Sequence, residues 1–138
     1  MIQPDLCPRP LISETTDGNR QWPLVNSPML DHVIVTVSNF TRSIAFYAQA
    51  LKPLGITDFL DYKGQDGHPD LKGFGNDGRF FFWLKVGRPN PDAVHFGFVA
   101  KSHAEVNAFF VAAIAAATWV FDPDGHDVEV VNKTGQID

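Results

Sequence analysis

The segment that decides the fold is LDHVIVTVSNFTRSIAFYAQALKPLG, residues 30–55. Its first part, residues 30–37, is rich in β-branched side chains and predicts a strand. A helix is expected over residues 40–51, because apolar side chains recur there at helical spacing and Ser38 and Asn39 offer a cap before it. A strand that leads directly into a helix is typical of a mixed α and β domain.

Three further strands are predicted after this helix, over residues 57–62, 71–74 and 80–86. The turn Asn76-Asp77-Gly78 carries the strongest short hairpin signal and joins the last two. The first half of the chain therefore has the predicted order β-α-β-β-β.

The second half repeats this pattern in shorter form, with a strand over residues 93–100, a helix over 103–117 and a last strand over 127–131. Each first strand carries one histidine, His32 or His95. In both modules an aromatic pair on the following helix begins 14 residues after this histidine. This equal spacing indicates a duplicated module.

The second copy is 16 residues shorter than the first between its helix and its final hairpin. Ala117 is followed directly by Thr118, with no glycine, proline or asparagine to turn the chain. We interpret this junction as the place where a mobile loop with a short strand is missing between Ala117 and Thr118. The alternative is a true deletion. Cα atoms about 3.8 Å apart would indicate the deletion.

The predicted organisation is one domain over residues 29–133, divided into modules 29–87 and 92–133. Residues 1–28 contain five prolines and little periodicity, so we expect an extended leader that contributes nothing to a functional site. Residues 134–138 form a tail.

Charge and hydropathy exclude several classes of partner. The formal net charge is -5 and no basic run is present, so nucleic acid and anionic membrane surfaces are not expected as partners. The longest apolar stretch, residues 108–121, is too short to span a bilayer. Cys7 is the only cysteine, which excludes an intrachain disulfide. We expect a cytoplasmic protein.

His32, His95 and Glu129 form the candidate metal site. The two histidines occupy equivalent points of the modules, and strand alternation places His32 with Ile34 and Thr36, and His95 with Gly97 and Val99. Glu129 lies in an apolar run, where a carboxylate must be exposed, paired or coordinated. Two histidines and one carboxylate suit Fe(II), Mn(II) or Zn(II). The alternative is that each serves packing or solvation only.

The residue four positions after the turn glycine is Glu129 in the second module and Phe82 in the first. Phe82 cannot ligate a metal, so coordination positions stay open for water or substrate. Alternation is expected to place Phe82 and Leu84 on the site face, with Phe81 and Trp83 against the helices. The candidates for substrate contact are Phe82, Tyr62 and Arg88. The other histidines, expected at the surface, are His68, His103 and His126.

Two motifs resemble those of the vicinal-oxygen-chelate superfamily, which includes glyoxalases, bleomycin resistance proteins and extradiol dioxygenases. Residues 30–55 carry the opening histidine and the Ser43, Phe46 and Tyr47 signature, and FDPDGHDVEVV, residues 121–131, is similar to the closing motif. The resemblance implies an α+β fold in which two βαβββ modules form a cup, here with the second module short of one strand. It also implies a divalent metal (Fe, Mn, Zn or Ni) held by His32, His95 and Glu129.

The function implied is that of a metal-dependent lyase, dioxygenase or thiol transferase acting on a small oxygenated molecule that chelates the ion. Glyoxalase I members use a fourth ligand where Phe82 stands, so this sequence is more similar to extradiol dioxygenases and fosfomycin-modifying thiol transferases. The alternative is a metal-free protein of the bleomycin-resistance type that binds a drug-like or aromatic ligand. The resemblance also implies a homodimer. The catalytic residues and the substrate are not indicated by the sequence.

Overall fold

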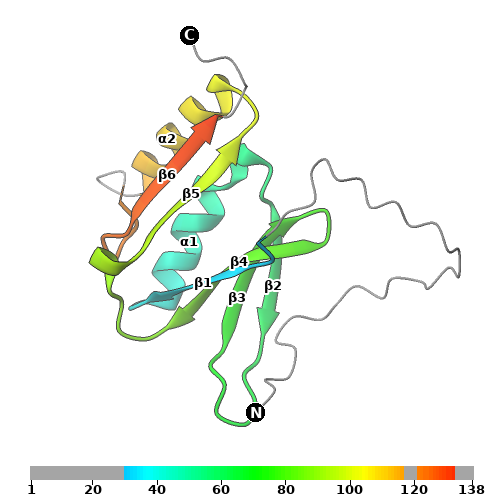
Figure 1. The fold of residues 1–138 in the computed structure, drawn as a ribbon, viewed down its shortest axis with the longest axis vertical. Helices are drawn as coiled ribbons and strands as arrows, with labels where there is room; N and C mark the ends of the chain where they lie inside the picture. Colours follow the sequence, from blue (N-terminus) through cyan, green and yellow to red (C-terminus); the bar gives the residue numbers. More distant parts are fainter. Residues whose placement is uncertain (1–29, 117–120, 133–138) are drawn as a thin grey trace, which may run out of the picture. The chain divides into compact units, whose positions relative to one another are not determined.

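The computed structural model describes residues 30–116 and 121–132. The predicted leader, the tail and the Ala117-Thr118 junction lie outside these residues. Figure 1 shows the order of elements, in which short 3-10 turns at Lys52–Leu54 and Pro91–Ala93 precede β2 and β5. The helices and strands are β1 Val33–Val37, α1 Phe40–Ala50, β2 Asp58–Tyr62, β3 Leu71–Asn76, β4 Arg79–Val86, β5 His95–Ala100, α2 His103–Ala116 and β6 Asp127–Asn132.

The two modules share one strand arrangement, which confirms the predicted α+β fold class. In the first module the strand order is β1-β4-β3-β2, with β1 parallel to β4. In the second, β5 is parallel to β6 in the same way. Within the described residues the second module has no counterpart of the strands β2 and β3, and only a single antiparallel bridge joins Phe121 to Asp127. The second module is therefore a shortened copy of the first.

Local sequence signals explain where α1 and the first hairpin begin and end. Asn39 caps α1, and its side-chain oxygen accepts a hydrogen bond from the backbone N–H of Arg42 at 3.0 Å. At the β3–β4 turn, Asp77 and Gly78 adopt φ values of 50° and 72°, as a two-residue hairpin turn with positive φ requires. Both elements match the sequence-based prediction.

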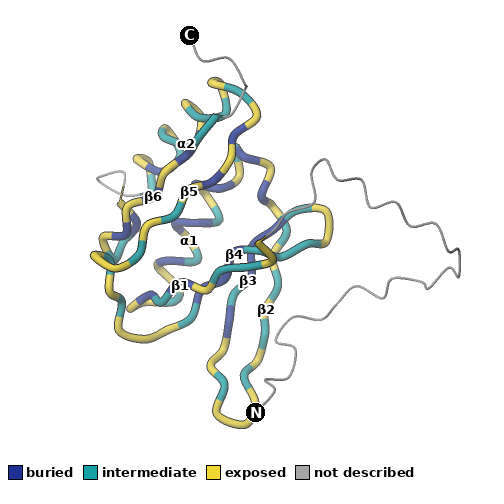
Figure 2. The backbone as a smooth tube through the Cα atoms, in the orientation of Figure 1, coloured by how far each residue is buried: buried dark blue, intermediate teal, exposed yellow. Residues whose placement is uncertain are grey.

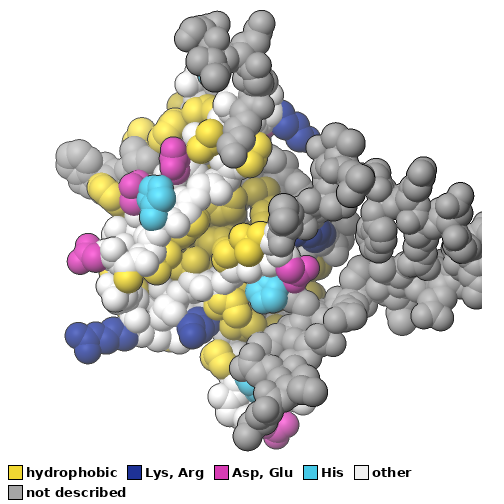
Figure 3. Space-filling model, viewed as in Figure 1, with side chains coloured by type: hydrophobic (Ala, Val, Ile, Leu, Met, Phe, Trp, Pro, Cys, Tyr) yellow, Lys and Arg dark blue, Asp and Glu magenta, His cyan; other side chains and the backbone are white. Residues whose placement is uncertain are grey.

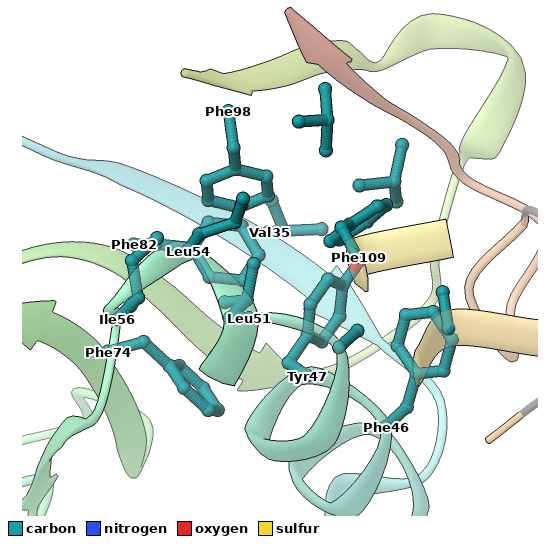
Figure 4. Close-up of a cluster of buried hydrophobic side chains, with 14 of the residues drawn as sticks. Val35, Phe46, Tyr47, Leu51, Leu54, Ile56, Phe74, Phe82, Phe98 and Phe109 are labelled. Carbon is teal, nitrogen blue, oxygen red and sulfur yellow. The ribbon is translucent and has the colours of Figure 1, made fainter. Parts of the chain in front are cut away.

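One hydrophobic core joins the two modules (Figure 4). The ring of Phe82 lies 4.8 Å from that of Tyr47 on α1 and 5.2 Å from that of Phe98 on β5, measured between centroids. Helices α1 and α2 also pack against each other. Because both modules bury side chains in the same aromatic cluster, one core holds the two modules together.

The predicted face of Phe82 is wrong. Phe82 is 1% exposed and packs against the helix, whereas Trp83 lies on the other side of the sheet and covers Gly73. The cause is a bulge: Gly75 pairs with Phe80 and Phe74 with Phe82, so Phe81 is an extra residue in β4. Counting from the turn glycine therefore misaligns the repeats by one residue.

The pairing register gives the correct alignment. Trp83 pairs with Ile34, two residues after His32, and Glu129 pairs with Gly97, two residues after His95. Trp83, not Phe82, is the counterpart of Glu129. Since an indole cannot ligate a metal either, the expectation of at most three protein ligands is unchanged.

The contact between Trp83 and Gly73 predicts a stability effect. A Cβ atom at Gly73 would lie 2.7 Å from Cζ3 of the buried Trp83, so Gly73→Ala should lower the free energy of unfolding by about 1–3 kcal/mol. Urea denaturation measures this. Gly97→Ala is the control, because its Cβ would meet the nearest described atom at 3.4 Å. Equal effects of the two substitutions would contradict the packing described.

Candidate metal-binding face

The candidate site lies on the side of the strands that faces away from the helices, called here the open face. Its residues are His32, Ile34 and Thr36 beside or in β1, His95, Gly97 and Val99 in β5, and Asp127 and Glu129 in β6. Burial alternates as predicted: Val35 and Val37 are buried while Ile34 is 38% exposed, and Phe98 is buried while Val99 is 65% exposed. Figure 2 shows this alternation along β5 and β6.

His95 and Glu129 meet on the open face. Nε2 of His95 lies 3.2 Å from Oε2 of Glu129, and Nδ1 of the same ring lies 3.5 Å from Oδ2 of Asp127. The register places Glu129 beside Gly97, which has no side chain to separate the carboxylate from the imidazole. The three side chains are each more than half exposed, so a ligand can reach them from solvent.

His32 has a different partner. Its Nδ1 lies 2.7 Å from Oδ2 of Asp31, and its side chain is 34% exposed. Arg79 at the start of β4 donates a hydrogen bond from Nη2 to the backbone oxygen of Asp31 at 3.0 Å, which fixes the chain just before β1. A carboxylate that accepts the Nδ1–H of a histidine leaves Nε2 as the lone-pair donor, the arrangement commonly seen behind metal-bound histidines.

The structure brings two of the three predicted ligands together and leaves His32 apart. Across residues 30–116 and 121–132, no three His, Cys, Asp or Glu side chains form a group that could hold a metal ion. Figure 3 shows histidines beside acidic side chains at two separate places, with hydrophobic surface between them. The His95–Glu129 pair fits two adjacent ligands, since donors each about 2.1 Å from one ion lie about 3.0–3.4 Å apart.

The predicted substrate contacts are not gathered at this pair. Phe82 belongs to the core. Tyr62 is half-buried at the end of β2, the outer strand of the first sheet and the one farthest in strand order from β1. Arg88 is exposed in the segment between β4 and β5. Tyr62 and Arg88 stay predictions.

The expectation that His126 lies at the surface is wrong. His126 is 1% exposed, and its Nδ1 lies 2.8 Å from Oδ2 of Asp122, which is also buried. The alternation of the sequence could have predicted this burial. His126, Val128 and Val130 are buried and alternate with the exposed Asp127 and Glu129, so His126 continues the core-facing side of β6 towards the turn. His103 is exposed and His68 is half-buried.

A groove of about 900 Å³ lies on the helix side of the domain, away from the predicted metal ligands. Its lining includes Arg42, Phe46 and Gln49 of α1 and Pro123 of the turn before β6. None of the predicted ligands lines this groove.

Comparison with known proteins identifies the fold. No family model matches the sequence, and no curated protein matches it. A glyoxalase/bleomycin resistance protein from Albidiferax ferrireducens T118 matches 77% of this chain and 99% of its own, with 21% identity and a TM-score of 0.61. A putative glyoxalase from Bacillus halodurans matches 75% of this chain and 95% of its own, with 19% identity and a TM-score of 0.51.

A mutant of the fosfomycin resistance protein FosX from Listeria monocytogenes, complexed with Mn(II) and 1S,2S-dihydroxypropylphosphonic acid, also matches. It covers 73% of this chain and 89% of its own, with 18% identity and a TM-score of 0.51. The chain thus has the glyoxalase-like fold of these proteins, with a shortened second module. None of the helices in the described part of the chain is long and apolar enough to cross a membrane.

The contact between Asp31 and His32 predicts the tautomer of His32. In metal-free protein the neutral ring of His32 should carry its proton on Nδ1, because the carboxylate of Asp31 accepts a hydrogen bond from that nitrogen. Long-range proton–nitrogen NMR correlations distinguish the two ring nitrogens. Asp31→Ala should shift His32 towards a mixture of tautomers, and Asp61→Ala, which removes an aspartate paired with Lys72 instead, should leave it unchanged. An Nε2-protonated ring in the unsubstituted protein would contradict the described contact.

Proposed function

We propose that the open face binds a divalent metal ion and that the protein is a metal-dependent enzyme acting on a small oxygenated molecule that chelates this ion. His95, Glu129 and His32 are the proposed ligands. The observation that carries the proposal is the 3.2 Å approach of His95 Nε2 to Glu129 Oε2 on an exposed sheet face. The fold shared with an Mn(II)-bound fosfomycin resistance protein supports it.

The chain's own residues define what such a site does. His95 and Glu129 supply one nitrogen and one oxygen donor, and Gly97 beside them leaves space above the strand. At most three protein ligands leave positions open for two substrate oxygens. When bound, the ion supplies Lewis acidity that stabilises negative charge developing on a chelating oxygen.

His32 is the ligand that requires a further step. It lies apart from the His95–Glu129 pair within one chain. We propose a homodimer in which His32 of one copy completes the pair of the other, and closure of the two modules within one chain is the alternative.

A metal-free binding protein is the second candidate, and the separate position of His32 favours it. The open face also exposes apolar Ile34 and Val99, 38% and 65% exposed, which suit an aromatic or drug-like ligand. Such a protein would need no ion to bind its ligand.

Metal binding separates the two functions. After removal of bound metal and reloading with Mn(II) or Zn(II), about one equivalent per chain is expected by atomic absorption. His95→Ala and Glu129→Gln should each weaken binding at least tenfold, as loss of a ligand does. His103→Ala is the control, since His103 is exposed at the start of α2. Less than about a tenth of an equivalent in the unsubstituted protein would favour the metal-free function.

A mixing experiment tests the shared site. His32→Ala and Glu129→Gln chains are mixed after partial unfolding and refolded together, and binding is measured at a metal concentration too low to fill either variant alone. If His32 of one copy completes the site of the other, mixed dimers retain one intact site, and about a quarter of the unsubstituted protein's metal capacity should return. If all ligands come from one chain, the mixture should bind no more metal than its components.

A further inference from the structure

Tyr47, Asp122 and His126 form a buried cluster, called here the carboxylate clamp. They are 0%, 3% and 1% exposed. Oδ2 of Asp122 accepts a hydrogen bond from the Tyr47 hydroxyl at 2.6 Å and lies 2.8 Å from His126 Nδ1. Oδ1 accepts from the backbone N–H groups of Asp124 at 3.0 Å and His126 at 2.9 Å. Partners on both oxygens compensate for the burial of this charge.

Further contacts fasten the turn to the start of α1. The backbone N–H of Ser38 donates to Oδ2 of Asp124 at 2.9 Å, and the Ser38 hydroxyl donates to Oδ1. Nη2 of Arg42 lies 3.3 Å from the same Oδ1. Burial, and then the charge of Asp122, raise the pKa of Tyr47 well above its usual range, so its hydroxyl keeps the proton it donates. The segment that leads into β6 is therefore bound to α1 through two carboxylates, those of Asp122 and Asp124.

Strand β6 needs such an anchor, because it pairs with β5 in parallel and no hairpin turn can join two parallel strands. It lies parallel to β5, and the chain between these strands passes through α2. A slip of one residue would turn Glu129 into the core and Val128 towards solvent, since side chains alternate along a strand. The imidazole of His126 is buried on the same side as Val128 and Val130.

We infer that the carboxylate clamp is a positioning device that holds β6 in the register presenting Glu129 to His95. Tyr47, Asp122 and His126 act through the strand and do not touch the proposed ion. The effect on metal affinity rests on the proposed function, but the register can be measured without any metal.

A designed cross-link measures the register. A Cβ atom at Gly97 would lie 3.4 Å from that of Glu129, close to the separation of about 3.5–4.5 Å in disulfides. In a Cys7→Ser background, Gly97→Cys with Glu129→Cys should cross-link readily under mild oxidation, followed by thiol alkylation and mass spectrometry. Adding Tyr47→Phe or Asp122→Asn should slow the cross-link at least threefold.

Ile56→Val is the matched control, because it shortens a buried side chain in module one that makes none of the clamp's hydrogen bonds. It should leave the cross-linking rate unchanged in protein that is folded by circular dichroism. Should Asp122→Asn not fold, the milder Tyr47→Phe decides. The inference is overturned if Tyr47→Phe cross-links as fast as Ile56→Val, or if the two cysteines do not cross-link with the clamp intact.

Metal affinity gives the second readout, in chains that keep Glu129. Tyr47→Phe should weaken Mn(II) binding at least tenfold and Ile56→Val should not. A protein that binds no metal at all would end the proposed function, while the cross-linking result would still decide the role of the clamp. Unchanged Mn(II) affinity in Tyr47→Phe would show that the clamp does not position Glu129.

Discussion

The buried carboxylate of Asp122 is the constraint on which the described structure depends most. Burying an ionised carboxylate costs several kcal/mol unless donors surround it, and removing one partner of such a group is strongly destabilising. Here the donors come from α1, through Tyr47, and from the turn and strand that follow Asp122. The carboxylate therefore requires the helix of module one and the last strand of module two to be in place together.

This contact joins the two most distinctive motifs of the sequence. The Phe46-Tyr47 pair stands on α1 and the Asp122-Pro123-Asp124-Gly125 turn precedes β6, far apart in sequence. In the folded protein the tyrosine of one motif donates to the first aspartate of the other. Both motifs thus stabilise the fold. They affect the proposed site only by positioning β6, the strand that carries Glu129.

Periodicity and turn chemistry were sufficient to predict the helices, the strands and the duplicated modules. They also predicted that burial alternates along the first strand of each module, as it does along β1 and β5. The face of Phe82 could not be predicted, since the bulge at Phe81 is set by pairing with β3 and has no signal in the residues themselves. His126 was misassigned because a histidine beside a turn is usually exposed, while its partner Asp122 is found only in the folded chain.

The candidate site was predicted in part for a similar reason. His95 and Glu129 lie on adjacent strands of one module, so strand pairing alone brings them together. His32 belongs to the other module, and its distance from the pair depends on how modules are arranged, within one chain or between copies. Alternation cannot determine that arrangement.

The proposed metal site is tested most directly by anomalous X-ray diffraction from crystals grown with Mn(II). An anomalous peak is expected on the open face, about 2.0–2.3 Å from His95 Nε2 and from a carboxylate oxygen of Glu129, with His32 of the same or a second copy as the third ligand. A peak held by other residues, or no peak beside His95 and Glu129 in crystals saturated with Mn(II), would contradict it.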